Sequence, residues 1–204
     1  MLLTKRLLVA AVLLISVAPP TASLAQSPPV RVRGTIASFS GDTLSVVTRE
    51  GPTVAIAMPA NVQPGALKRL TFDDIKPNSF IATVAAPNAK GELEAVYVNV
   101  FAEAQRGTGE GHYDWDLMPG SSMTNATVTS IANPGAGRKL SLVYKGNPID
   151  VTVPPNAIIM TGIPASRDDL KKGARVFINA SKAADGSLTA LRLTVGKDGI
   201  DPPQ

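Results

Sequence analysis

The side chains best suited to chemistry lie together in one stretch of the sequence, residues 102–123. This stretch contains the only histidine, His112, and the only tryptophan, Trp115. Imidazole nitrogen, carboxylate oxygen and thioether sulfur are ligands that copper or another divalent ion accepts. The stretch is therefore a candidate metal site, whose ligands would be His112, Asp114, Asp116, Met118 and Met123.

The same stretch is also typical of a recognition surface. Tyrosine and tryptophan are favoured at binding hot spots because each buries a large area and keeps one polar group. Long segments of this kind are often functional in compact proteins. A ligand or partner would contact His112, Tyr113, Asp114, Trp115 and Asp116.

A third interpretation is structural: Tyr113 and Trp115 fill a groove between two flanking domains while the acidic residues face water. A single histidine without a second histidine or a cysteine is a weak metal signal. The residue types therefore favour packing or recognition over metal binding.

Most kinds of catalysis lack the residues they need. The chain has no cysteine, which excludes thiol chemistry and thiolate–metal sites. It has no P-loop and no Gly-x-Ser-x-Gly elbow. We therefore predict a protein that is not an enzyme and has no cofactor, unless it binds the divalent metal considered above.

The first 25 residues read as an export signal. Lys5 and Arg6 precede an apolar run at residues 7–17, and residues 23–25 form a small-residue cleavage site. Cleavage leaves 18 basic against 16 acidic residues, a net charge of +2. We expect a periplasmic protein with no membrane span after cleavage. This charge and the scarcity of aromatic residues argue against nucleic-acid binding.

Two segments on either side of residues 102–123 resemble each other. A shift of 95 residues superposes Gly51 on Gly146 and Pro59 on Pro154. The same shift superposes the paired carboxylates at 73–74 on those at 168–169, which we predict cap the start of helical turns. The sequence therefore predicts one β-rich unit built twice.

Alternating apolar residues and turn residues predict five strands around one helical turn in each unit. The predicted strands are residues 32–36, 43–48, 53–58, 79–86, 92–100, 124–131, 139–144, 149–153, 174–180 and 187–195. This order is that of an OB-like barrel. We predict an all-β protein of two tandem five- to six-stranded OB-like barrels, each with one short helical turn. The predicted parts are a signal peptide (1–25), a first barrel (26–101), a linker (102–123), a second barrel (124–196) and a disordered tail (197–204).

Three segments, VRGTI at 32–36, SRDDLKKGARV at 166–176 and DGSLTALRLTV at 185–195, resemble exported bacterial proteins with small OB-like barrels of unknown function. Some similar sequences are labelled metal-transporter permease, which implies at most an association with metals. We therefore expect a periplasmic non-catalytic binding or scaffolding module. Its partner would be an envelope protein, a glycan or a small ligand. The alternative is a periplasmic metal-binding protein associated with metal homeostasis.

Overall fold

The computed structural model describes residues 28–133 and 137–204, and this part of the chain is all-β with three single-turn 3-10 helices. The strands are β1 (Val30–Ser40), β2 (Thr43–Thr48), β3 (Thr53–Ala57), β4 (Gly65–Arg69), β5 (Phe80–Pro87), β6 (Leu93–Val100), β7 (Gly111–Asp114), β8 (Ser122–Ala132), β9 (Arg138–Tyr144), β10 (Asn147–Val153), β11 (Ile158–Pro164), β12 (Arg175–Lys182) and β13 (Leu188–Val195). The predicted all-β class is confirmed. The predicted signal peptide lies outside the described residues.

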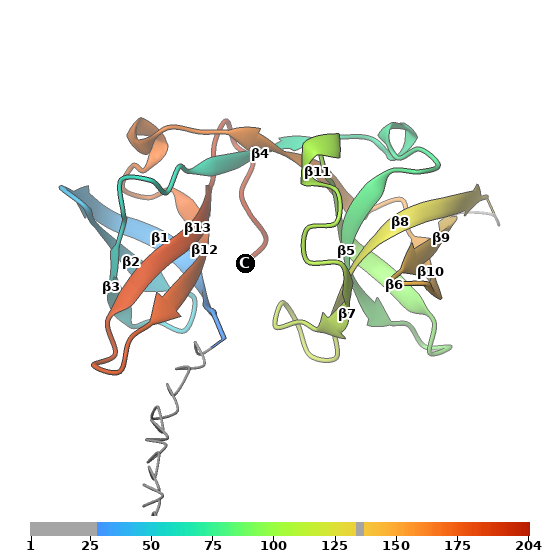
Figure 1. The fold of residues 1–204 in the computed structure, drawn as a ribbon, viewed down its shortest axis with the longest axis horizontal. Helices are drawn as coiled ribbons and strands as arrows, with labels where there is room; N and C mark the ends of the chain where they lie inside the picture. The colour runs from blue at the N-terminus through green and yellow to red at the C-terminus, as the bar shows by residue number, and fades with distance from the viewer. Residues whose placement is uncertain (1–27, 134–136) are drawn as a thin grey trace, which may run out of the picture.

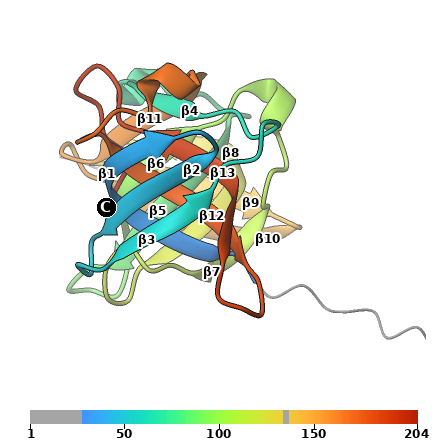
Figure 2. The ribbon, with the colours of Figure 1, turned by 90° about the vertical axis from the view of Figure 1, so that its left-hand side faces the viewer.

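The strands form one continuous sheet that curls into a closed ring of five strands at each end (Figure 1). The central ring consists of β5, β6, β8, β9 and β10, and it closes where β10 pairs with β6. The terminal ring consists of β1, β2, β3, β12 and β13, and it closes where β13 pairs with β3. Figure 2 shows the terminal ring from the outside, with its strands inclined across the view.

The strand pairing differs from the sequential division into residues 26–101 and 124–196. The first three strands pair with the last two, because β1 lies beside β12. The chain leaves the terminal ring through β4 and returns through β11, and these two strands pair antiparallel. β4 also pairs with β13 of the terminal ring, and β11 pairs with β6 of the central ring, so the sheet continues from one ring to the other. The terminal ring is therefore built from the two ends of the chain, and the central ring from its middle.

The two rings share a common geometry. β12 and β13 begin and end 95 residues after β5 and β6. The pairing of β5 with β6 shifts at Val84/Ala85, and that of β12 with β13 shifts at Asn179/Ala180, again 95 residues later. β8 begins and ends 92 residues after β1. Positions in one ring can therefore be compared with matching positions in the other.

Two turns carry the paired carboxylates predicted as caps. The helices are η1 (Phe72–Asp74) and η3 (Arg167–Asp169), with a third, η2 (Glu103–Gln105), after β6. Only the second carboxylate of each pair caps: Asp74 accepts from the backbone N–H of Thr71, and Asp169 from that of Ser166. Asp73 instead forms an ion pair with Arg138.

Three apolar cores hold the fold together. The core of the terminal ring includes Ile36, Leu44, Ile56, Ile178 and Leu193. The core of the central ring includes Ile81, Val98, Ala126, Leu140 and Leu142. A third core gathers buried residues of β4, β5, β6, β8 and β11, and partly buried side chains of the linker and the tail pack against it.

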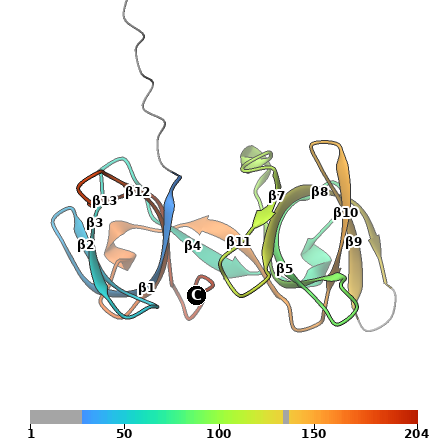
Figure 3. The same ribbon diagram turned by 90° about the horizontal axis from the view of Figure 1, so that it is seen from below.

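The tail, expected to be disordered, lies against the folded chain. In Figure 3 the C-terminus lies between the two rings. Lys197 forms an ion pair with Asp169 at 3.0 Å, Ile200 packs against the third core, and Pro202 is buried. The polar composition suggested fraying, but these contacts hold the tail in place.

Candidate functional site

Residues 102–123 are an ordered extension of the central ring. β7 pairs antiparallel with the first four residues of β8, with His112 opposite Thr124. A tight connection follows, in which the backbone N–H of Trp115 donates to the carbonyl of Ser121. The hydroxyl of Ser121 also donates within this connection, at 2.9 Å from the carbonyl oxygen of Trp115. Sequence reasoning placed no strand here, because its four residues show no periodicity.

Trp115 joins the central ring to the terminal ring. The Cζ atom of Arg31 on β1 lies 4.0 Å from the centroid of the Trp115 ring. The aromatic side chain of Phe177 lies on the outer face of β12 in the terminal ring. Its centroid is 6.2 Å from that of Trp115. Trp115 and Leu117 also pack against the third core. Guanidinium and indole faces attract one another, so this contact supports the packing interpretation of Trp115.

Asp116 neutralises part of an arginine cluster on the terminal ring. Its carboxylate lies 3.0 Å from the Nη2 atom of Arg33 and 3.5 Å from the Nη1 atom of Arg31. Its backbone carbonyl accepts a hydrogen bond from Arg49. The side chain of Arg33 is only 3% exposed, so it needs this countercharge.

The pKa of Asp116 reflects two opposing effects. Partial burial, the largest single effect, raises the pKa of this carboxyl group. The hydrogen bond from Arg33 and the charges of Arg33 and Arg31 together outweigh burial, so the pKa lies below its usual range. Asp116 is therefore a structural anion rather than a proton donor at neutral pH.

His112 lies on the face of β7 that carries the side chain of its partner Thr124, toward one end of the central ring. Its Nδ1 atom lies 2.8 Å from the hydroxyl oxygen of Thr124. Its ring stacks on Tyr144 at the end of β9, with a centroid distance of 6.1 Å and an interplanar angle of 29°. Asp114 lies on the same face of β7, two residues further along, and is exposed.

Tyr113 points to the opposite face of β7 and remains 38% exposed. The side-chain amide of Asn125 donates to its hydroxyl at 3.4 Å, and the Trp115 ring lies 6.1 Å away. Burial raises the pKa of Tyr113, while the charge of Arg31 acts in the opposite direction. The phenol is thus held in place and stays neutral well above neutral pH.

The structure does not gather the five proposed metal ligands. Asp116 is engaged by Arg33, Met123 is buried in the third core, and Met118 is 39% exposed. His112 and Asp114 lie on one face of β7. Tyr113, which pairs with Met123, lies on the other face. Within residues 28–133 and 137–204, no three histidine, aspartate or glutamate side chains group as a metal site. The alternation of side chains along β7 explains why neighbours in sequence separate in space.

Sequence reasoning missed a buried polar group inside the central ring. Thr83 on β5 and Thr124 on β8 face each other and are both fully buried, and Ser122 is 8% exposed. The hydroxyl oxygens of Thr83 and Ser122 have no hydrogen-bond partner among the described residues. The 95-residue repeat could have indicated this group, because it matches the polar Thr83 with the apolar Ile178.

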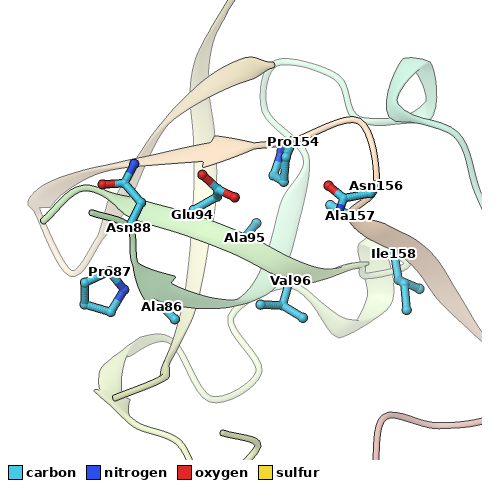
Figure 4. Close-up of a pocket in the computed structure, with 10 residues that line it drawn as sticks. All are labelled: Ala86, Pro87, Asn88, Glu94, Ala95, Val96, Pro154, Asn156, Ala157 and Ile158. Atoms are coloured by element: carbon cyan, nitrogen blue, oxygen red, sulfur yellow. The ribbon is translucent and has the colours of Figure 1, made fainter. Parts of the chain in front are cut away.

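A separate hollow of about 270 Å³ lies where β6 passes from β10 to β11 (Figure 4). It is lined by the β5–β6 hairpin and by the segment between β10 and β11. Glu94 is the one charged side chain among its lining residues, with Asn88 and Asn156 as the polar neighbours. None of the residues predicted for a site lines this hollow.

The fold thus defines an all-β protein with a closed five-stranded barrel and additional strands. Within the described part of the chain, no helix has the length and apolar character needed to cross a membrane. No protein-family model, curated protein or solved structure matches the chain.

Proposed function

We propose that this protein is an exported, non-catalytic binding or scaffolding module of the bacterial periplasm. The basic, apolar and small-residue pattern of residues 5–25 supports export. The absence of cysteine and the single histidine in the sequence support a role without thiol or triad chemistry. The resemblance of segments 32–36, 166–176 and 185–195 to exported bacterial proteins supports the same assignment.

We further propose that both rings are OB-like barrels made from two copies of one unit. The cyclic order β1-β2-β3-β13-β12 in the terminal ring matches β8-β9-β10-β6-β5 in the central ring. In this proposal each copy contributes its first three strands to one barrel and its last two to the other. The exchange supports a scaffolding role, because neither barrel can form without both halves of the chain.

One observation carries the binding role: Tyr113 is displayed on a strand rather than used inside the fold. Its neighbours Trp115 and Asp116 dock onto the terminal ring, whereas 38% of Tyr113 remains exposed. Asn125 and Trp115 hold the phenol, so a partner would order few additional groups on binding. Met118, 39% exposed, follows in the same hairpin, and tyrosine and methionine are both enriched at protein interfaces. The occupant we infer is a partner protein of the envelope.

The test is site-specific photo-crosslinking in cells that export the protein. A photoreactive side chain at position 113 should yield one discrete adduct, which mass spectrometry then identifies. The matched control is position 191, because Leu191 on β13 is also exposed, at 53%, but lies on the terminal ring. Absence of an adduct at 113, or the same adducts at both positions, would contradict the proposal.

A further inference from the structure

The two rings differ in what fills one end of their interior. In the terminal ring Val32 on β1 lies opposite Ile178 on β12. At the matching register of the central ring, Thr124 lies opposite Thr83. The pair nearer the start of β1 and of β8 on the same face follows the same rule, since Val30 opposite Ala180 corresponds to Ser122 opposite Ala85. The central ring therefore buries three hydroxyl groups where the terminal ring buries alkyl groups.

These hydroxyl groups are not needed to build the ring. Those of Thr83 and Ser122 have no hydrogen-bond partner among the described residues, and burying an unpaired hydroxyl destabilises a protein. The terminal ring shows that valine and isoleucine fit the same positions. Groups that lower stability without serving the fold are typical of functional sites.

Other polar and aromatic groups lie at the same end of the central ring. β7 pairs with β8 there, and His112 contacts the hydroxyl of Thr124. Asp114 lies opposite Ser122, on the same face of β7 as His112. The stacked rings of His112 and Tyr144 add flat surfaces. Asp114 is the one carboxylate in this set, and the set includes no arginine or lysine.

We propose that this end of the central ring binds a small, neutral, polyhydroxylated molecule such as one sugar unit. The hydroxyls of Thr83 and Ser122 both donate and accept, which matches the alcohols of a sugar. The faces of His112 and Tyr144 pack against its C–H groups. A phosphate or another anion would meet Asp114 with no compensating cation, and an apolar ligand would leave the hydroxyls unpaired.

Thr83 is fully buried, so a ligand can reach its hydroxyl only after part of this end of the ring moves, and we assign that movement to β7. β7 has four residues and pairs only with β8 among the described strands. The loops that flank it contain Gly109 and Gly120, both at positive φ, which glycine adopts at little cost. This site uses the face of β7 opposite to Tyr113.

The experiment is a two-dimensional amide NMR titration of the purified protein with D-glucose. Amide signals of residues 82–84 and 122–125 should shift saturably, with a Kd of roughly 1 to 10 mM for a ligand of this size. Cyclohexanol, which has the same ring size and one hydroxyl group, should leave them unchanged. No saturable shift at these residues up to about 100 mM, tenfold above the expected Kd, would overturn the proposal.

Two near-isosteric variants test the assignment of the hydroxyls. Thr83→Val and Ser122→Ala should each weaken glucose binding by about fivefold or more, since each removes one hydrogen bond. Their urea midpoints should equal or exceed that of the parent protein, whereas a structural role for the hydroxyls predicts lower ones. The control Thr53→Val, on the exposed side of β3, should change neither quantity. Unchanged glucose binding in both variants would mean that glucose does not contact these hydroxyls and would overturn the proposal.

Discussion

The guanidinium carbon of Arg31 lies 4.0 Å from the centre of the Trp115 ring, and this contact ties the middle of the chain to its first strand. Asp116 strengthens the same junction through Arg33. Trp115 and Asp116 thus both serve the junction between the rings. The side chains that remain available for recognition are on the two faces of β7, Tyr113 on one and His112 with Asp114 on the other.

Replacement of Trp115 by alanine should lower the free energy of unfolding by about 2 to 3 kcal/mol, less than for a fully buried tryptophan because Trp115 is only partly buried. Trp115→Phe should recover most of the loss, since it keeps an aromatic face for Arg31. Urea unfolding followed by circular dichroism measures both. Tyr113→Ala, which removes the more exposed neighbour, serves as the control and should cost less than about 1 kcal/mol. Equal losses in all three variants would show that the hairpin does not join the rings through Trp115.

Asp116 should make stability depend on acid pH. Its pKa in the folded protein lies below the unfolded value of about 3.9, so the unfolded chain takes up the proton more readily. The stabilisation is therefore complete above about pH 4 and is lost as the pH falls through the lowered folded-state pKa. Asp116→Asn should cost about 1 to 2 kcal/mol at pH 6, a value reduced by the 41% exposure of the carboxylate, and much less at pH 3.

Urea unfolding between pH 3 and pH 6 measures this dependence. The matched control is Asp114→Asn, because Asp114 lies two residues earlier and takes part in none of the ion pairs among the described residues. A constant difference between the parent protein and Asp116→Asn across this range would exclude the ion pair as its source.

Gly34 should be essential for the close approach of β1 and β2. A Cβ atom at this position would overlap the carbonyl oxygen of Val47 and lie 2.9 Å from the Cα atom of Thr48. Both contacts are backbone atoms, so a side chain cannot move away to relieve them. Gly34→Ala should therefore lower stability by about 3 kcal/mol or more.

The control for Gly34 is Gly162→Ala on β11, where a Cβ atom would meet nothing within 4 Å. It should change stability by less than about 0.5 kcal/mol. Thermal unfolding of both variants compares them under the same conditions. Equal behaviour of the two alanine variants would mean that β1 and β2 are not packed this closely.

Removal of residues 197–204 should destabilise the protein although the segment contains no strand. It removes the ion pair of Lys197 with Asp169 and the contact of Ile200 with the third core. Loss of this burial and of one ion pair should cost about 2 kcal/mol. The measurement is the urea midpoint of the truncated chain, compared with a chain that lacks only Gln204. A midpoint unaffected by the longer truncation would restore the expectation of a disordered tail.

The sequence predicted most strands to within two residues, because alternation and turn residues act locally. It did not predict β4 or β11, whose short runs contain Gly65, Gly162 and Pro164. It predicted two sequential barrels and did not predict that the first three strands pair with the last two. The alternating pattern specifies which face of a strand is buried, whereas β5 and β12 present similar faces to β1.

The same limit applied to the site. Composition drew attention to Trp115 and His112, but their partners, Arg31 and Thr124, depend on how the strands are paired. The arginines of β1 reach the linker only because β1 pairs with β12 in the ring that the linker faces. The buried hydroxyls became meaningful only when Thr83 could be compared with Ile178 in a second ring of the same geometry.

The exchange of strands underlies each of these contacts, and engineered disulfides test it most directly. The chain has no cysteine, so any cross-link arises from the introduced pair. Val30 lies opposite Ala180, and a sequential barrel would instead place it opposite Ala85, 95 residues earlier. Directly opposed strand residues have Cβ atoms about 4.5 to 5.5 Å apart, close to the roughly 3.5 to 4.5 Å found in disulfides.

The measurement compares Val30→Cys/Ala180→Cys with Val30→Cys/Ala85→Cys after mild oxidation, by non-reducing gel and mass spectrometry. The exchanged fold predicts an intramolecular disulfide in the first protein and free thiols in the second. The reverse result, a disulfide between positions 30 and 85 with free thiols in the other pair, would contradict the fold and the sites derived from it.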